Sequence, residues 1–199
     1  MKVVQVQARC LSIPIKFPFT EAPYTAGMLM VQVETDDGIV GTGIARDSER
    51  FAVRELINRE IGPFLLGKSP LETEKVWNDA AWEIGMSYKV RGGAVGRAIG
   101  AVDQALWDIK AKALGVPVNH LVGGPLRDKV KVYTHFGGIG KSPDEFAASA
   151  IAAVEMGFRA IKGDPFQPQN FSLDAAAMRT AVERIRKTRE AIGDDVDIL

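Results

Sequence analysis

A lysine and an aspartate close a short apolar run in residues 158–166, which read FRAIKGDPF. Lys162 and Asp164 lie two residues apart, and because alternate residues of a strand point to the same face, both side chains are predicted to face one space. One interpretation is a surface ion pair at the end of an edge strand. The other is a pair of groups that point into an active site.

Residues 135–142, HFGGIGKS, have features of a phosphate-binding loop, because they follow a predicted strand, precede a predicted helix and end in Gly-Lys-Ser. That motif requires a glycine five residues before Gly140, and this chain has His135 there. Pro143 also removes a backbone amide at the helix start. A turn followed by a helix with Ser142 as its N-cap explains the same residues. A nucleotide-binding protein that uses this loop is therefore kept only as an alternative.

The composition is that of a soluble globular protein and excludes several classes of function. Of the 199 residues, 46% are hydrophobic and 25% are charged, which argues against disorder. Lysine plus arginine and aspartate plus glutamate both number 25, so no net field attracts nucleic acid or an anionic membrane. Cys10 is the only cysteine, which excludes an internal disulfide and a cysteine-rich zinc site. The chain has neither the apolar core of a secretion signal nor a stretch of membrane-span length, so a cytoplasmic protein without membrane or nucleic-acid partners is expected.

The first part of the chain is predicted to form a small sheet of strands. Residues 2–15 alternate apolar and polar residues, as a half-buried strand does. Residues 28–35 and 39–45 show the same alternation on either side of Asp-Asp-Gly at 36–38. Asp-Gly between two such runs predicts a β-hairpin.

Three helices are predicted to follow this sheet. The first covers residues 49–60 with Ser48 as its N-cap, and the second lies within residues 67–85 with Ser69 before a proline in its first turn. The third lies within residues 96–117 and ends at a glycine and a proline. Spacings of three and four residues predict its apolar face, which consists of Ile99, Val102, Leu106, Ile109 and Ala113.

Strand patterns alternate with helix patterns after about residue 125. Strands are predicted at residues 129–136, 158–164 and 196–199, and helices are predicted at 142–157 and 172–193. This alternation predicts parallel pairing and an α/β architecture.

Two domains are therefore predicted. Residues 1–125 form an α+β N-terminal capping domain, and residues 126–199 form the start of a (β/α) TIM-type barrel with two βα units and a third strand. A complete eightfold barrel takes about 250 residues, so the barrel is incomplete in this chain. We expect the remaining barrel strands to lie beyond Leu199.

His135 and Tyr133 lie two residues apart in the predicted strand at residues 129–136. Both are predicted to face the barrel centre near its C-terminal end, where barrel active sites are built. A substrate contact and a structural role fit His135 equally well. Core packing is the simpler explanation for Tyr133.

Several segments together resemble one known family. The run AVDQALWDIKAKALGVPVNHLVGG, followed by VKVYTHFGG, is similar to the enolase superfamily, in its mandelate racemase and muconate lactonizing enzyme-like group of acid-sugar dehydratase type. The hairpin VQVETDDGIVGTGIA and the segment PFLLGKSP carry the same resemblance, which covers essentially the whole chain as an N-terminal portion. The resemblance implies an α+β capping domain that closes over a modified (β/α) barrel.

The resemblance also implies the chemistry of the site. Magnesium binds three carboxylates at the ends of successive barrel strands, a base removes the proton next to a substrate carboxylate, and the metal stabilises the resulting enediolate. These ligands are expected beyond Leu199, so no metal ligand is predicted within the chain. The remaining half of the barrel is an implied partner, and a homo-oligomer is expected.

The same resemblance assigns roles to the opening pair. In the racemase-like group the second barrel strand ends in Lys-x-Lys, where the first lysine neutralises the substrate carboxylate and the second is the base. Here Lys162 matches the first position and Asp164 replaces the second lysine. A related dehydratase subset carries a non-lysine residue here and uses a histidine–aspartate pair from later strands.

Two loops of the capping domain are implied to contact the substrate. Residues 17–24 correspond to the specificity loop of the family, so Phe19 and Tyr24 are predicted to screen the substrate from water. Arg46 corresponds to a second closing loop. His135 is the predicted substrate contact from the barrel.

The leading hypothesis is a Mg²⁺-dependent acid-sugar dehydratase, a lyase that abstracts the proton alpha to a carboxylate through an enediolate and acts on a small-molecule sugar acid. Because one base is expected, dehydration is favoured over racemisation, which needs bases on both faces. The alternatives are a racemase or epimerase of the same superfamily, a nucleotide-binding protein, and a non-catalytic fragment.

Overall fold

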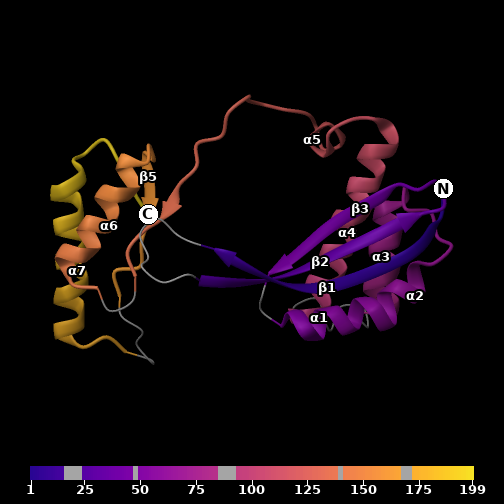
Figure 1. Ribbon diagram of the computed structural model, residues 1–199, viewed down its shortest axis with the longest axis horizontal. Helices are drawn as coiled ribbons and strands as arrows, with labels where there is room; N and C mark the ends of the chain where they lie inside the picture. The colour runs from indigo at the N-terminus through magenta and orange to yellow at the C-terminus, as the bar shows by residue number, and fades with distance from the viewer. Residues whose placement is uncertain (16–23, 47–48, 85–92, 139–140, 167–171) are drawn as a thin grey trace. The chain divides into compact units, whose positions relative to one another are not determined.

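The chain forms two compact units in the computed structural model (Figure 1). The structure describes residues 1–15, 24–46, 49–84, 93–138, 141–166 and 172–199. Met1–Ile15 and Tyr24–Leu126 make up the first unit, and the second unit contains Arg127–Leu199. Among the helices of the described ranges, none combines the length and the hydrophobicity that a bilayer-spanning segment requires.

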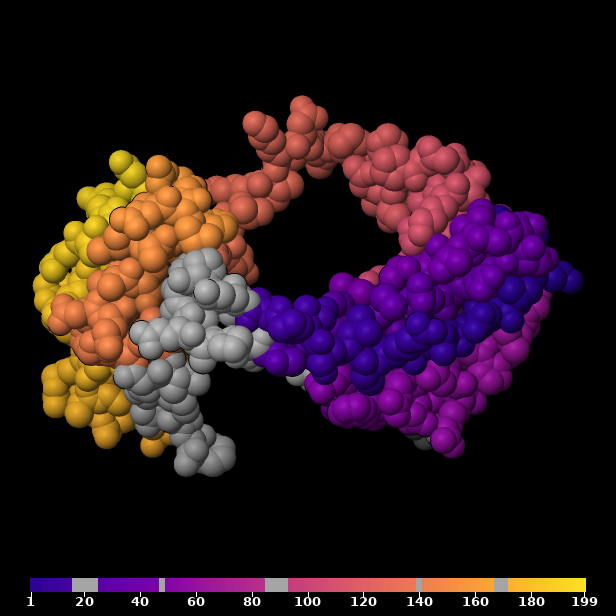
Figure 2. All heavy atoms as spheres, viewed as in Figure 1, coloured from indigo at the N-terminus to yellow at the C-terminus, as the bar shows by residue number. Residues whose placement is uncertain are grey.

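An antiparallel sheet forms one layer of the first unit. In spatial order its strands are β1 (Val3–Ile15), β2 (Tyr24–Thr35) and β3 (Val40–Arg46). The predicted first strand and the predicted hairpin are both confirmed, and Gly38 supplies the positive φ of 79° in the β2–β3 turn. The indigo atoms of β1 run across the face of this unit that is turned to the viewer in Figure 2.

Helices form the second layer of this unit. They are α1 (Arg50–Leu56), the π-helical turn η1 (Ile57–Ile61), α2 (Gly62–Leu65), α3 (Thr73–Glu83), α4 (Gly93–Leu114) and the short α5 (Val118–Leu121). Leu29, Val31 and Val33 of β2 are completely buried in the core shared by the sheet and these helices. Alternation along β2 thus directs one face inward, as the sequence pattern predicts.

Helices α1 and α3 both begin without a side-chain cap. Glu49, with a φ of 60° and no side-chain cap, precedes α1, and Ser48 lies outside the described residues. The prediction that Ser69 and the proline after it lie at the first turn of the second helix is wrong, because that helix begins at Thr73 after Glu72. The Ser69 hydroxyl instead accepts a hydrogen bond from the Leu71 amide at 3.4 Å. A serine before a proline can close such a local turn in competition with a helix start.

Helix α4 confirms most of the predicted apolar face. Four of its five residues are buried, and the prediction for Ala113 is wrong because that residue is exposed. Lys112, in the last turn of α4, donates a hydrogen bond to the carbonyl oxygen of Val40, the first residue of β3. The helix therefore extends as far as the start of that strand. Gly115 then ends the helix with a φ of 68°.

Glycines let α4 approach β3 closely. A Cβ on Gly43 would lie 1.9 Å from the carbonyl oxygen of Ala101, and one on Gly41 would lie 2.1 Å from that of Ala105. No side chain fits into such a space. Gly41 and Gly43 are therefore required by packing.

Side chains of α4 also cover the open edge of β3. Asp108 accepts a hydrogen bond from the Thr42 amide at 2.9 Å, and the amide group of Gln104 pairs with both backbone groups of Ile44 at 3.2 Å. Polar groups of an edge strand invite pairing with another chain unless they are covered. The segment that carries the family resemblance thus has a structural role in this unit.

The second unit contains a parallel βα repeat. Its elements are β4 (Thr134–His135), α6 (Pro143–Glu155), β5 (Ala160–Lys162), α7 (Ala175–Ile192) and β6 (Asp197–Ile198), and the strand order is β4-β5-β6. Helices α6 and α7 pack side by side (Figure 1), and Phe136, Phe146, Ala150, Ala153, Ile161 and Val196 form the buried core. The predicted alternation of strands and helices, and their parallel pairing, are confirmed.

The strand predicted at residues 129–136 is wrong in its first half. Only Thr134–His135 join the sheet, and Val130 and Val132 are 71% and 60% exposed. An apolar alternation becomes a strand only when a partner receives its hydrogen bonds. No described strand pairs with residues 129–133.

Candidate functional site

Lys162 and His135 end two adjacent strands of the second unit. They are register partners in the parallel pair β4–β5, so their side chains emerge from the same face of the sheet. Ile161, which alternates with Lys162, is completely buried in the cluster that contains Phe146 of α6. The two side chains therefore point to the face opposite the helices, and both are exposed.

Tyr133 completes this group of residues. The Lys162 ammonium nitrogen lies 5.6 Å from the centre of the Tyr133 ring, within the range of a cation–π contact. The rings of Tyr133 and His135 have centroids 6.1 Å apart. The Tyr133 side chain is 48% exposed on the face opposite the helices, so it is not part of the buried core of the described residues.

Close packing beneath the strand end explains the glycine between the two charged residues. A Cβ on Gly163 would lie 2.7 Å from the Phe136 ring and 3.0 Å from the Phe146 ring. These two rings pack against each other at an interplanar angle of 58°, with centroids 4.9 Å apart. Gly137, which follows β4, meets Phe146 in the same way, at 2.4 Å. Both strand exits therefore run directly over this aromatic pair.

Asp164 is held by its own turn rather than by Lys162. Its Oδ1 accepts a hydrogen bond from the Phe166 amide at 2.9 Å, which closes a local Asx turn. Within the part of the chain that the structure describes, no ion pair joins Lys162 to Asp164 or to another carboxylate. The surface ion pair considered from the sequence is thus not formed.

The opposite end of the same sheet face is electrostatically different. Lys131 forms an ion pair with Asp197 of β6, and the hydrogen bond from Lys131 lowers the pKa of the Asp197 carboxyl. Asp197 is the register partner of Ala160 at the start of β5, whereas Lys162 is at its end. Of these two lysines, Lys162 is the one that forms no ion pair within the described residues.

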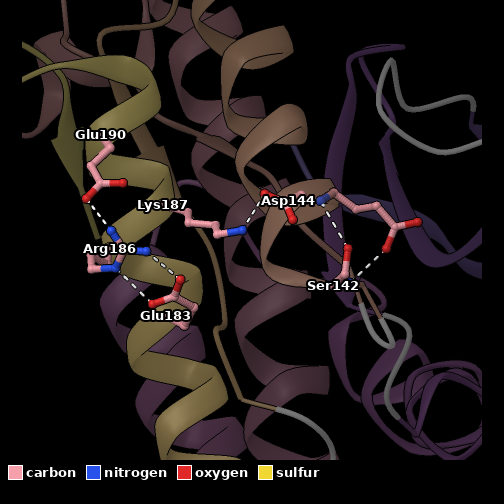
Figure 3. Close-up of polar contacts among 7 residues, drawn as sticks. Ser142, Asp144, Glu183, Arg186, Lys187 and Glu190 are labelled. Carbon is pink, nitrogen blue, oxygen red and sulfur yellow. Dashed lines mark hydrogen bonds and ion pairs between the residues drawn. The ribbon is translucent and has the colours of Figure 1, made fainter.

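The start of α6 is occupied by a capping box. The Ser142 hydroxyl accepts from the Glu145 amide, while the Ser142 amide donates to the Glu145 carboxylate at 2.8 Å. These bonds lower the pKa of Glu145. Two amides that a phosphate would need are thus engaged, and Asp144 adds a further negative charge to the first turn (Figure 3). This geometry disfavours nucleotide binding and confirms Ser142 as the N-cap.

The predicted capping-domain contacts belong to the first unit. Arg46 is the last residue of β3, is exposed, and is the register partner of Met28. Phe19 and the side chain of Tyr24 lie outside the described residues. Of the predicted site residues, the structure brings His135 and Lys162 together.

In the described ranges, no group of three or more His, Cys, Asp or Glu side chains is arranged to hold a metal ion. The described residues therefore do not fit a magnesium ion by themselves.

The architecture defines the class of protein. A helix-covered antiparallel sheet, followed by a parallel βα repeat, is also found in an enolase-superfamily structure that superposes on the whole chain. Residues 1–123 match the family model "Mandelate racemase / muconate lactonizing enzyme, N-terminal domain". The chain belongs to this family.

Curated relatives extend the similarity beyond the first unit. D-gluconate dehydratase of Thermoproteus tenax is 37% identical over 182 residues, which cover 90% of this chain and 36% of that protein. D-galactonate dehydratase of Pectobacterium atrosepticum is 35% identical over 170 residues, covering 85% and 43%. The chain thus spans less than half the length of these relatives.

A solved structure gives the same result for the fold. The crystal structure of a member of the enolase superfamily from Polaromonas sp. JS666 superposes with a TM-score of 0.80 at 28% identity. The match covers 100% of this chain and 51% of that chain. Both units of the chain therefore have counterparts in this superfamily.

Proposed function

We propose that the intact protein is an acid-sugar dehydratase, which removes water from a sugar acid to give a 2-keto-3-deoxy acid. The observation that carries this proposal is Lys162, a cation at the carboxyl end of β5 that lies beside His135 and Tyr133 and forms no ion pair with a described carboxylate. The names of the two dehydratase relatives support the reaction class.

In the proposed reaction, Lys162 binds the substrate carboxylate. A base removes the proton from the adjacent carbon, and the electron pair moves into the carboxylate, whose negative charge increases. A fixed ammonium group at this place stabilises that increase more than it stabilises the ground state. Hydroxide then leaves from the next carbon with a proton, and the enol that forms becomes the ketone. His135 contacts the substrate beside Lys162.

Asp164 supports dehydration over racemisation. Racemisation needs one base on each face of the reacting carbon, and a second lysine in the strand-end motif would supply one of them. Here that position holds Asp164, whose carboxylate is engaged by the Phe166 amide. A single base from a barrel strand outside residues 1–199 is sufficient for dehydration.

We further propose that barrel strands outside residues 1–199 complete the site and that their carboxylates would hold Mg²⁺ there. We also propose a homo-oligomer that functions in the cytoplasm, which sedimentation and cell fractionation of the intact protein would test.

The test is a panel of sugar acids offered to the intact protein with Mg²⁺, with detection of the 2-keto-3-deoxy product. Gluconate and galactonate are the first members, because the two relatives carry those names. Turnover of at least one panel member is expected. Exchange of the alpha proton with deuterated solvent, without loss of water from any panel member, would favour a racemase or epimerase and contradict the proposal.

A further inference from the structure

Helix α7 carries one buried arginine among charged residues that are exposed or half-buried. Arg184 is only 4% exposed. By contrast, Arg186 on the same helix forms ion pairs with Glu183 and Glu190 at the surface, and Lys187 reaches Asp144 at the start of α6 (Figure 3). The surface pairs are of the kind that stabilises a helix weakly. Burial sets Arg184 apart from them.

The Arg184 guanidinium joins two segments that are distant in sequence. Its Nε and Nη2 donate to the carbonyl oxygen of Lys141 at 3.0 and 2.5 Å, and its Nη1 donates to that of Pro165 at 2.6 Å. Lys141 lies in the connection between β4 and α6, and Pro165 lies in the connection between β5 and α7. The planar fork of an arginine holds both carbonyl groups in a fixed geometry, which the single ammonium group of a lysine on its flexible stem does not provide.

Stability alone gives a weak reason for this arrangement. Removing a guanidinium from water is costly, and a buried ion is compensated best by a carboxylate. The bonds of Arg184 within the described residues go to carbonyl oxygens, and it forms no ion pair there. An apolar side chain would fill the same space without that cost. Arg184 is therefore better explained by its hydrogen bonds to the two carbonyl groups, which hold the backbone on either side of them.

That backbone leads directly from the candidate site. Pro165 follows Asp164 and lies three residues after Lys162, and the Lys141 segment follows the strand that ends in His135. We propose that Arg184 is a positioning residue, which fixes the exits of β4 and β5 and thereby the directions of the His135 and Lys162 side chains. The catalytic part of this inference rests on the proposed dehydratase function.

Three variants of the intact protein test the inference. Arg184→Met keeps the length of the side chain and removes all three hydrogen bonds, and Arg184→Lys can hold one carbonyl group. Arg186→Met is the matched control, because it removes an exposed arginine from the same helix. The measurements are kcat and KM for the best sugar acid, the melting temperature, and hydrogen exchange of the individual amides.

The expected result is a loss of kcat without loss of folding. A misplacement of about 1 Å can cost on the order of a hundredfold in rate, so Arg184→Met should lower kcat about ten- to a hundredfold at temperatures where it is folded. Arg184→Lys should recover part of this loss, and Arg186→Met should stay within about twofold of the parent protein. In Arg184→Met, exchange should quicken at Gly138 and Lys141 and at Gly163 and Phe166, but not in the middle of α7.

Two results would overturn the inference. One is a folded Arg184→Met variant with unchanged kcat, because a purely structural arginine lowers the melting temperature and not the rate of each folded site. The other is unchanged exchange at both strand exits. If Arg184→Met does not fold, the same criteria apply to Arg184→Lys. If the parent protein turns over no sugar acid, the dehydratase proposal fails, and the exchange pattern alone decides whether Arg184 fixes the two exits.

Discussion

His135 and Lys162 are register partners at the carboxyl ends of adjacent parallel strands, and both side chains emerge on the sheet face opposite the helices. Tyr133 lies on the same face, 5.6 Å from the Lys162 nitrogen. The second unit thus presents the Lys162 ammonium group, an imidazole and a phenol on one face of its sheet.

Replacing Lys162 should separate catalysis from folding. Lys162→Met removes the charge and keeps most of the stem, so turnover should fall on the order of a hundred- to a thousandfold. The free energy of unfolding should change by about 1 kcal/mol or less, because the side chain is exposed and its length is conserved. Steady-state kinetics on the best sugar acid and thermal melting measure the two effects. Near-normal turnover would mean that Lys162 is structural.

Asp164 offers a test of what its carboxylate does. Asp164→Asn keeps the oxygen that accepts from the Phe166 amide, so the turn should persist. If the turn is the main role, kcat should fall by less than about tenfold in Asp164→Asn and further in Asp164→Ala, which loses the bond. Equal and severe loss in both variants would instead assign the negative charge itself to the reaction.

Gly163 should tolerate no side chain. The new methyl group of Gly163→Ala would lie 2.7 Å from the Phe136 ring, and such overpacking costs about 1–3 kcal/mol. Urea unfolding measures this cost. Gly100→Ala is the control: no atom lies within 4 Å of the added Cβ in the middle of α4, so it should stabilise by about 0.5–1 kcal/mol. Phe136→Leu combined with Gly163→Ala should recover part of the loss if the ring is the cause.

The edge of β3 should depend on Asp108. Asp108→Ala removes the acceptor of the Thr42 amide and the ion pair with Lys112, and should lower the free energy of unfolding by about 1–2 kcal/mol. Asp108→Asn keeps an acceptor and should be milder. Concentration-dependent association of the alanine variant, followed by light scattering, would indicate that the exposed edge pairs with another chain.

Glu145 should contribute to the acid sensitivity of the protein. Hydrogen bonds from Ser142, the backbone amide first, lower its pKa in the folded state. Its contribution to stability is therefore present above the pKa of an unfolded glutamate, about 4.3, and is lost as the pH falls through the lowered value.

The measurement is the melting temperature of the parent and of Glu145→Gln between about pH 5 and pH 3. Glutamine keeps an acceptor and does not titrate, so the variant should lose less stability over this range. Glu155→Gln, at the other end of α6, is the control for a general change of charge. A steeper loss in Glu145→Gln than in the parent would contradict the prediction.

Local patterns in the sequence determined the order and type of most elements. The hairpin at Asp-Asp-Gly, the capping box that begins with Ser142, and four of the five apolar positions of α4 depend on neighbours within a few residues, which periodicity and capping reveal. The apolar pattern also predicted the strand that ends at Lys162. The resemblance of the sequence to the enolase superfamily then predicted what Lys162 does in the reaction.

Only the tertiary structure decided which side chains are buried and which distant residues they contact. Gly163 is required by two rings that precede it by many residues, and Arg184 is buried while Arg186, in the same run of basic residues, is exposed. Ser69 forms a local turn instead of lying in the first turn of a helix. Residues 129–133 do not form a strand, because no described strand pairs with them. Such contacts join segments that are far apart in the chain, and a one-dimensional pattern contains no information about which distant side chain will occupy a given space.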